Sequence, residues 1–180
     1  MTMEPKYYKN WHLAKNPSEY RVTEFEYTVV RFYEAFQRWV TTVGDMLVNS
    51  DIKFSEHLIL HVIRMQNRPK TGVTIARMIN RDDLPNIQYS LRKLEAAKLI
   101  QKTKDSGSKT FAYEVTDLGR RMTDEYSSIR SDLLMANLRA IADFEERIAD
   151  ATQLLSVLTG IYEETSRNSA TYDQESLSPK

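Results

Sequence analysis

The sequence predicts a mainly α-helical fold with one small β-hairpin. Across most of its 180 residues, apolar side chains recur at steps of three and four, which is the period of an amphipathic helix. Between residues 99 and 116 this pattern changes to two short strand-like runs, separated by a polar Ser-Gly segment. The length and the hydrophobic fraction of 41% support one ordinary domain with extensions.

The composition excludes several classes of chemistry. The chain contains no cysteine, so it holds no disulfide, zinc–thiolate site or iron–sulfur cluster of its own. Its five glycines are too few for a phosphate loop or a dinucleotide fingerprint. It has no apolar run of about 18 residues, and residues 1–10 do not resemble a secretory signal. We expect a cytoplasmic protein that needs no cofactor and is not an enzyme.

The charge is unevenly distributed although the formal net charge is zero. Residues 51–121 carry 14 basic and eight acidic side chains, whereas residues 122–180 carry five basic and 11 acidic ones. A basic middle region is the electrostatic pattern of a protein that binds a polyanion such as nucleic acid.

The periodicity divides the chain into five segments. The predicted segments are an N-terminal arm (1–17), a long amphipathic helix (18–50), a compact region of three short helices and a hairpin (51–116), a second helical region (117–162) and a polar, disordered tail (163–180). The region 117–162 is compatible with one long helix or with two helices separated by a bend.

The three short helices have recognisable start signals. Ser55, Thr71 and Asp83 each offer a side-chain oxygen as an N-cap. Pro85 falls in the first turn of the third short helix, where a missing N–H costs nothing, and this helix is expected to reach about Lys98.

The hairpin completes a known order of elements. We expect strands at Leu99–Thr103 and Thr110–Thr116. Three short helices followed by a hairpin are the order of a winged helix-turn-helix. The long flanking helices have apolar stripes that a module of about 60 residues cannot cover, which predicts a homodimer. The candidate interface residues are Phe25, Phe32, Ile148, Leu155 and Leu158.

The third short helix has two chemically distinct faces. At helical spacing, Ile87, Leu91 and Leu94 share one side with Ser90. The remaining surface has no carboxylate until Glu95, and it presents groups that pair with bases or phosphates. The candidate DNA contacts on this helix are Pro85, Asn86, Gln88, Tyr89, Arg92 and Lys93. An ordinary solvated face is the alternative, although such a face usually carries Glu beside Lys.

The hairpin tip and the turn motif supply further candidates. The tip is basic and hydroxyl-rich, so it could reach phosphates or the minor groove, and a soluble turn is the alternative reading. The additional candidate DNA contacts are Thr71, Lys104, Ser106, Ser108 and Lys109.

Two motifs connect these elements to a known family. Residues 85–95 (PNIQYSLRKLE) resemble the recognition helix of the MarR family of winged-helix transcription regulators, and residues 115–120 (VTDLGR) resemble its exit from the wing into a dimerisation helix. The resemblance extends from about Phe54 to Met122. The family's Asp-x-Arg wing signature is absent, because Gly107 stands where the arginine would follow Asp105. Lys109 is the candidate for its phosphate contact.

The resemblance implies how such a protein works. It implies a homodimer that reads a pseudo-palindromic operator, with recognition helices about 34 Å apart. It also implies a small aromatic or phenolic effector, bound between the dimer helices and the DNA-binding region. The candidate effector-binding residues, which could equally be core residues, are Phe36, Trp39, Val43, Leu47, His57 and His61. We expect the protein to associate with a bacterial nucleoid when it binds DNA.

Two other functions remain open from the sequence. A winged helix can bind protein through its long helices instead of binding DNA. His57 and His61 lie four residues apart, so they could share a metal ion in a metal-responsive regulator, although packed histidines are commoner. Ser90–Lys93 and Lys70–Gly72 match β-lactamase motifs in reversed order, which we interpret as coincidence.

Overall fold

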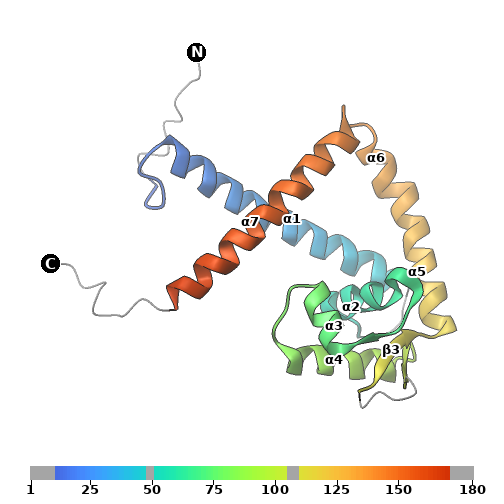
Figure 1. Ribbon diagram of the computed structural model, residues 1–180. Coiled ribbons are helices and arrows are strands. Elements are labelled where there is room, and N and C mark those ends of the chain that lie inside the picture. Colours follow the sequence, from blue (N-terminus) through green and yellow to red (C-terminus); the bar gives the residue numbers. More distant parts are fainter. Residues whose placement is uncertain (1–10, 48–50, 105–109, 171–180) are drawn as a thin grey trace. The chain divides into compact units, whose positions relative to one another are not determined.

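The computed structural model describes residues 11–47, 51–104 and 110–170 (Figure 1). The chain divides into two compact units, Met1–Ile129 and Arg130–Lys180. The predicted fold class is confirmed: the chain is mainly helical and carries one small antiparallel sheet. Within the described ranges, no helix is both long and apolar enough to cross a membrane.

The first unit contains a long helix followed by the short helices and the sheet. Its helices are α1 (Pro17–Leu47), α2 (Phe54–Arg64), α3 (Gly72–Met78), α4 (Leu84–Ala96) and α5 (Asp117–Ile129), with a 3-10 turn at Met65–Asn67 after α2. Its strands are β1 (Lys70–Thr71), β2 (Ile100–Thr103) and β3 (Ala112–Val115). Figure 1 shows α2, α3 and α4 gathered beside the sheet.

The sheet is larger than the predicted hairpin. Its strand order is β1-β3-β2 and all pairs are antiparallel, with Tyr113 opposite both Lys70 and Lys102. The sequence did not predict β1, because two residues are too short to produce an alternating pattern. This strand ties the start of α3 to the wing formed by β2 and β3.

One apolar core holds α2, α3 and α4 against the sheet. The largest fully buried apolar side chains are Ile59, Leu60, Ile63, Ile75, Ile87, Leu91, Leu94, Leu99 and Ile100. The inward side of α4 that the sequence predicted is thereby confirmed, since Ile87, Leu91 and Leu94 are fully buried and Ser90 is buried beside them.

Two of the three predicted N-caps are confirmed. Thr71 accepts a hydrogen bond from the Thr74 N–H at 3.2 Å, and Asp83 accepts one from the Asn86 N–H at 3.2 Å. The prediction that Ser55 caps α2 is wrong. The helix starts at Phe54, so its N-cap is Lys53, two residues before Ser55. Glu56 accepts the Lys53 N–H at 3.0 Å, because a longer side chain in the first turn can reach back to the cap.

Gly119 allows α5 to start close beside β2. A Cβ at this position would lie 2.1 Å from the Leu99 carbonyl oxygen, which is a backbone atom that cannot move aside. The approach is fixed by the Thr116 N–H, which donates to the same oxygen at 3.0 Å. The wing and α5 are therefore joined by close backbone packing.

We expect Gly119→Ala to destabilise the protein by about 3 kcal/mol, because the added methyl group forces the two backbones apart. The control is Gly160→Ala, since Gly160 is also helical but a Cβ there meets nothing within 4 Å. Alanine favours helices, so this control should stabilise the protein by up to about 1 kcal/mol. Urea unfolding of both variants measures the difference, and the same sign of change in both would contradict the packing argument.

The structure shows whether the region 117–162 forms one helix or two. After α5, a π-helical turn (Arg130–Met135) and the short α6 (Ala136–Leu138) lead to a break, and α7 begins at Phe144. Asp143, before α7, has a left-handed backbone with φ of 53°. The region therefore contains two long helices.

The predicted start of the polar tail is too early. Helix α7 spans Phe144–Ser169 and so includes the first seven residues of the segment 163–180. Neither glycine nor proline interrupts this stretch, and Arg167 pairs with Glu164 one turn away at 2.6 Å, which supports a helix even in a polar sequence. Residues 171–180 lie outside the described part of the chain.

The described end of the N-terminal arm packs on α1. The Trp11 ring lies 5.6 Å from the rings of both Tyr20 and Tyr27, measured between centroids. Ala14 and Thr23 are both buried, and the Thr23 hydroxyl lies 3.5 Å from the Leu13 carbonyl oxygen of the arm and donates to the Glu19 carbonyl at 2.9 Å. Trp11 thus covers the first turns of the helix.

Candidate nucleic-acid interface

Helix α4 presents a polar surface opposite its buried side. Pro85, Asn86 and Arg92 are exposed, and 55% of Tyr89 is accessible to solvent. Because Asp83 caps the helix and Ile87 and Leu91 are fully buried, this surface is held in a fixed orientation. Hydrogen-bonding side chains on an exposed, rigidly mounted helix are what a DNA major groove accommodates.

Two further candidates lie at the edge of this surface. Gln88 is half-buried and its amide nitrogen lies 2.7 Å from the place that a Cβ on Gly72 would occupy, so Gly72 makes room for it. Thr71 is also half-buried, and its hydroxyl oxygen caps α3 and lies 3.0 Å from the Thr74 hydroxyl. Their contacts with DNA stay predictions.

Lys93 differs from the other residues predicted on α4. Its ammonium nitrogen lies 3.6 Å from an Asp51 carboxylate oxygen and 3.7 Å from one of Glu56, and the side chain is only 22% exposed. The Lys93 ammonium is therefore paired with two carboxylates of the protein itself. Lys93 thus connects α4 to Asp51 and to Glu56 of α2. A direct DNA contact by Lys93 stays a prediction.

Glu56 connects the start of α2 to α4. Its carboxylate is buried and accepts hydrogen bonds from the Ser90 hydroxyl at 2.7 Å and from the Lys53 N–H at 3.0 Å. Burial alone would raise the pKa of Glu56, but these hydrogen bonds and the Lys93 ammonium outweigh it and lower the pKa. The ionised carboxylate fixes the rotation of α4 against α2.

A cleft beside α4 is lined by basic side chains that were not predicted from the sequence. It is lined by the start of α2, the turn between α3 and α4, and α4 itself; Lys53, Ser55, Arg81 and Tyr89 contribute to it. Lys53 and Arg81 are exposed. Their positions in the sequence could have indicated them, because each residue precedes the start of a helix. The free backbone N–H groups at a helix start also favour a bound anion.

If this cleft receives a DNA backbone phosphate, Lys53→Gln and Arg81→Gln should each weaken binding to every duplex sequence by a similar factor. Each should also lower the slope of log affinity against log salt by about 1, because one fewer counterion is released. Lys15→Gln, which removes an exposed charge before α1, is the control. Titrations at several salt concentrations measure the slope, and unchanged slopes would remove the cleft from the interface.

The wing is only partly described. Lys104 is exposed at the end of β2. Lys102 is engaged, because its ammonium lies 2.8 Å from a Glu95 carboxylate oxygen of α4. Ser106, Ser108 and Lys109 lie outside the described residues, so the predicted contacts of the wing tip stay predictions.

The predicted effector residues belong to α1 and α2, two helices that pack against each other. Val43 and His57 are buried, Trp39 and Leu47 are half-buried, and Phe36 is partly exposed and makes an edge contact with Phe54 at 5.8 Å. A Cβ on Gly44 would lie 2.2 Å from the His57 ring, so Gly44 provides the space for this histidine. Effector binding by these residues stays a prediction.

His57 is buried and His61 is half-buried. Both ring nitrogens of His57 lack a hydrogen-bond partner among the described residues, and the His61 ring lies 4.3 Å from that of Tyr126. Burial lowers the pKa of His57, and burial together with the nearby His57 lowers the pKa of His61 to about 4. The described residues bring no group of three metal-ligating side chains together.

The predicted dimer residues lie on apolar stripes of two helices. On α1, Phe32 is 68% exposed and stacks on Phe36, with 6.4 Å between the ring centroids. Phe25 is half-buried. Helix α7 is described in full and buries none of its residues; Ile148 and Leu155 are exposed and Leu158 is half-buried. Their role in a dimer stays a prediction.

Comparison with known proteins agrees with this geometry. Residues 52–119 match a family described as "Winged helix DNA-binding domain". None of the curated proteins matches the sequence. The match covers α2 to the start of α5, which includes α4 and the wing.

Three solved structures show the same fold. The regulator BldR from Sulfolobus solfataricus has 20% identity and a TM-score of 0.62, over 76% of this chain and 95% of that one. A mutant MarR from E. coli, solved in complex with operator DNA, has 15% identity and a TM-score of 0.62, over 77% and 95%. A MarR family transcription regulator has 14% identity and a TM-score of 0.63, over 83% and 98%. The predicted resemblance is confirmed at the level of the fold: residues 52–119 match the winged helix DNA-binding domain family, and the chain has the fold of the MarR-type transcription regulators.

Proposed function

We propose that the protein is a sequence-specific DNA-binding transcription regulator that inserts α4 into the major groove of its operator. The observation that carries this proposal is the exposed surface of α4, where Asn86, Tyr89 and Arg92 project from a helix whose opposite side is fully buried. Arginine recognises guanine and phosphates, and asparagine recognises adenine. The E. coli MarR mutant of the same fold was solved with its operator DNA, which supports the same activity here.

We further propose that the regulator binds a pseudo-palindromic operator as a homodimer. Apolar stripes on α1 and α7 support this, because exposed phenylalanine, leucine and isoleucine in such numbers mark an interaction surface. A second copy of the same chain is the simplest partner, since it supplies the same stripes by symmetry. Each subunit would then read one half-site, with the two copies of α4 about one DNA turn apart.

Regulation by a small aromatic or phenolic effector is also part of the proposal. The residues between α1 and α2 that were predicted to bind it combine aromatic rings with the unpartnered nitrogens of His57 and the buried Nε1 of Trp39, which could serve an effector's polar group. A ligand there would contact both α1 and α2, and α2 is bonded to α4 through Glu56.

The test is selection of bound duplexes from a random pool by the full chain, followed by titration of the selected sequence and of a scrambled one. We expect an inverted repeat with half-sites one helical turn apart, and a steep loss of affinity as salt rises. Selection without enrichment, with weak binding to both duplexes, would contradict the proposal and favour a winged helix that binds protein.

A further inference from the structure

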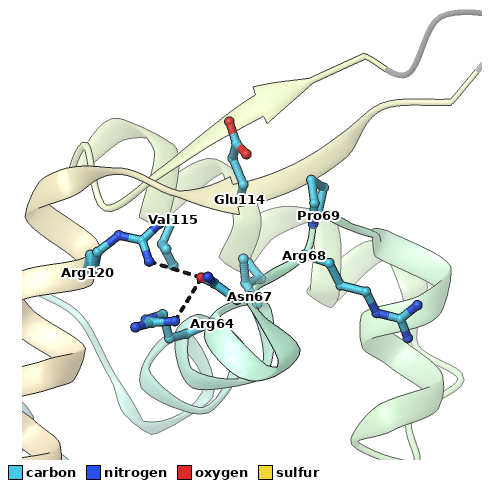
Figure 2. Close-up of a pocket in the computed structure, with 8 residues that line it drawn as sticks. Arg64, Asn67, Arg68, Pro69, Glu114, Val115 and Arg120 are labelled. Carbon is cyan, nitrogen blue, oxygen red and sulfur yellow. Dashed lines mark hydrogen bonds between the residues drawn. The ribbon is translucent and has the colours of Figure 1, made fainter.

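We propose that the root of the wing contains a binding site for a small oxyanion, meaning a carboxylate or phosphate group. The site lies between the end of α2, the turn before β1, the strand β3 and the first turn of α5 (Figure 2). Arg64, Asn67 and Arg120 form its polar side, and Pro69 and Val115 contribute its apolar walls. It shares no lining residue with the cleft beside α4, so the inference does not depend on DNA binding.

Two arginines converge on one neutral oxygen in this site. The Asn67 side-chain oxygen accepts a hydrogen bond from Arg64 Nη1 at 2.9 Å and another from Arg120 Nη1 at 3.0 Å (Figure 2). An amide oxygen has two lone pairs, so both are used, yet it carries no charge to offset the two cations. Like charges held this close repel each other unless an anion lies nearby.

Only one of the two arginines has a carboxylate within ion-pair distance among the described residues. Arg64 Nη2 lies 3.3 Å from an Asp124 carboxylate oxygen, but Arg120 forms no ion pair with any residue in the described ranges. Glu114 also lines the cleft, but its carboxylate accepts a hydrogen bond from Gln101 at 2.8 Å. Figure 2 shows that carboxylate on the outer side of β3, turned away from Arg64 and Arg120.

Two further observations point to a missing acceptor. The Nε atom of Arg64 is buried and has no hydrogen-bond partner among the described residues. Gln66 and Asn67 both have left-handed backbones, with φ of 61° and 50°. Such a conformation is unfavourable for glutamine, although asparagine adopts it more readily, and strain of this kind is concentrated at ligand-binding positions.

The donors suit an oxyanion in particular. A guanidinium presents its N–H groups in a planar fork that matches the two oxygens of a carboxylate or a phosphate. An oxyanion bound to the unused donors of Arg120 would give this arginine an ion-pair partner and connect α5 to the turn after α2. The ligand would therefore stabilise the junction of the wing with α5.

The experiment measures the melting temperature of the full chain at pH 7 during titration with sodium phosphate or with sodium acetate, using chloride to keep the ionic strength constant. We expect at least one oxyanion to raise the melting temperature saturably, by about 5–11 °C at 100 times its Kd. A rise with phosphate alone assigns a phosphate group, and a rise with acetate assigns a carboxylate.

Arg120→Gln should abolish the rise, whereas Arg121→Gln should keep it, because Arg121 is exposed and lies one residue further along the same helix. A linear rise shared by all three proteins, or no rise in the wild type, would overturn the proposal. If Arg120→Gln does not fold, NMR of the wild type decides the question: the Asn67 side-chain amide signals must shift saturably with the oxyanion, and unchanged signals overturn the site.

Discussion

Phe32→Glu is expected to convert the protein into a folded monomer that binds DNA about 100-fold more weakly. A carboxylate placed in an apolar interface loses its hydration without gaining a partner, so association becomes unfavourable. A monomer engages only one half-site and loses the gain that comes from binding two sites at once. The fold should persist, because Phe32 is 68% exposed and takes no part in the core around α2, α3 and α4.

Thr42→Glu is the control, since it introduces the same charge at an exposed polar position of α1. Sedimentation velocity measures the oligomeric state, and a mobility-shift titration measures the affinity. A dimer that survives Phe32→Glu would show that the α1 stripe serves another purpose.

The second large effect concerns acid stability. His61 has a pKa of about 4 in the folded protein, lowered from 6.5 first by burial and then by the nearby His57. An unfolded chain takes up the proton below about pH 6.5, whereas the folded chain resists it until about pH 4. The contribution of neutral His61 to the free energy of unfolding is therefore fully present above about pH 6.5. It is lost as the pH falls toward 4, by up to about 3 kcal/mol.

His61→Phe should flatten this pH dependence, because it keeps the ring contact with Tyr126 and removes the titrating group. His12→Gln is the control, since His12 is exposed. Urea unfolding between pH 7 and pH 4 measures the effect. His57 adds to it, because burial lowers its pKa as well, although Asp45 and Glu56 act in the opposite direction. Identical curves for the wild type and His61→Phe would contradict the assignment.

The sequence predicted the features that depend on the regular spacing of residues along a helix. A helix has a fixed angle per residue, so the positions of Ile87, Leu91 and Leu94 were enough to place Arg92 and Tyr89 on the exposed surface of α4. The caps at Thr71 and Asp83 were predicted for a similar reason, since each bonds to a residue three positions along the chain.

The sequence did not predict the features that depend on distant partners. Lys93 has the spacing of a DNA contact, but its ammonium lies near Asp51 and Glu56, which come from another part of the chain. The same reason applies to Ser90, whose hydroxyl donates to Glu56 at 2.7 Å across 34 positions. No local pattern reports such contacts, because they arise only when α2 packs on α4.

The position of the oxyanion site was invisible in the same way. Asn67 joins Arg64, three residues before it, to Arg120, which lies 53 positions later. The polar tail shows a different limit, because the helical preference of 163–169 depends on side-chain pairs within α7 rather than on apolar spacing.

Arg92→Ala decides whether the exposed surface of α4 reads DNA bases. Affinity of the wild type and the variant is measured for the selected operator and for duplexes changed at single base pairs. We expect a loss of about 5-fold to 160-fold on the operator, or about 1–3 kcal/mol, together with relaxed discrimination at one base pair. Arg21→Ala, at an exposed position of α1, should change neither. Equal affinity and equal discrimination by the wild type and Arg92→Ala would contradict the claim.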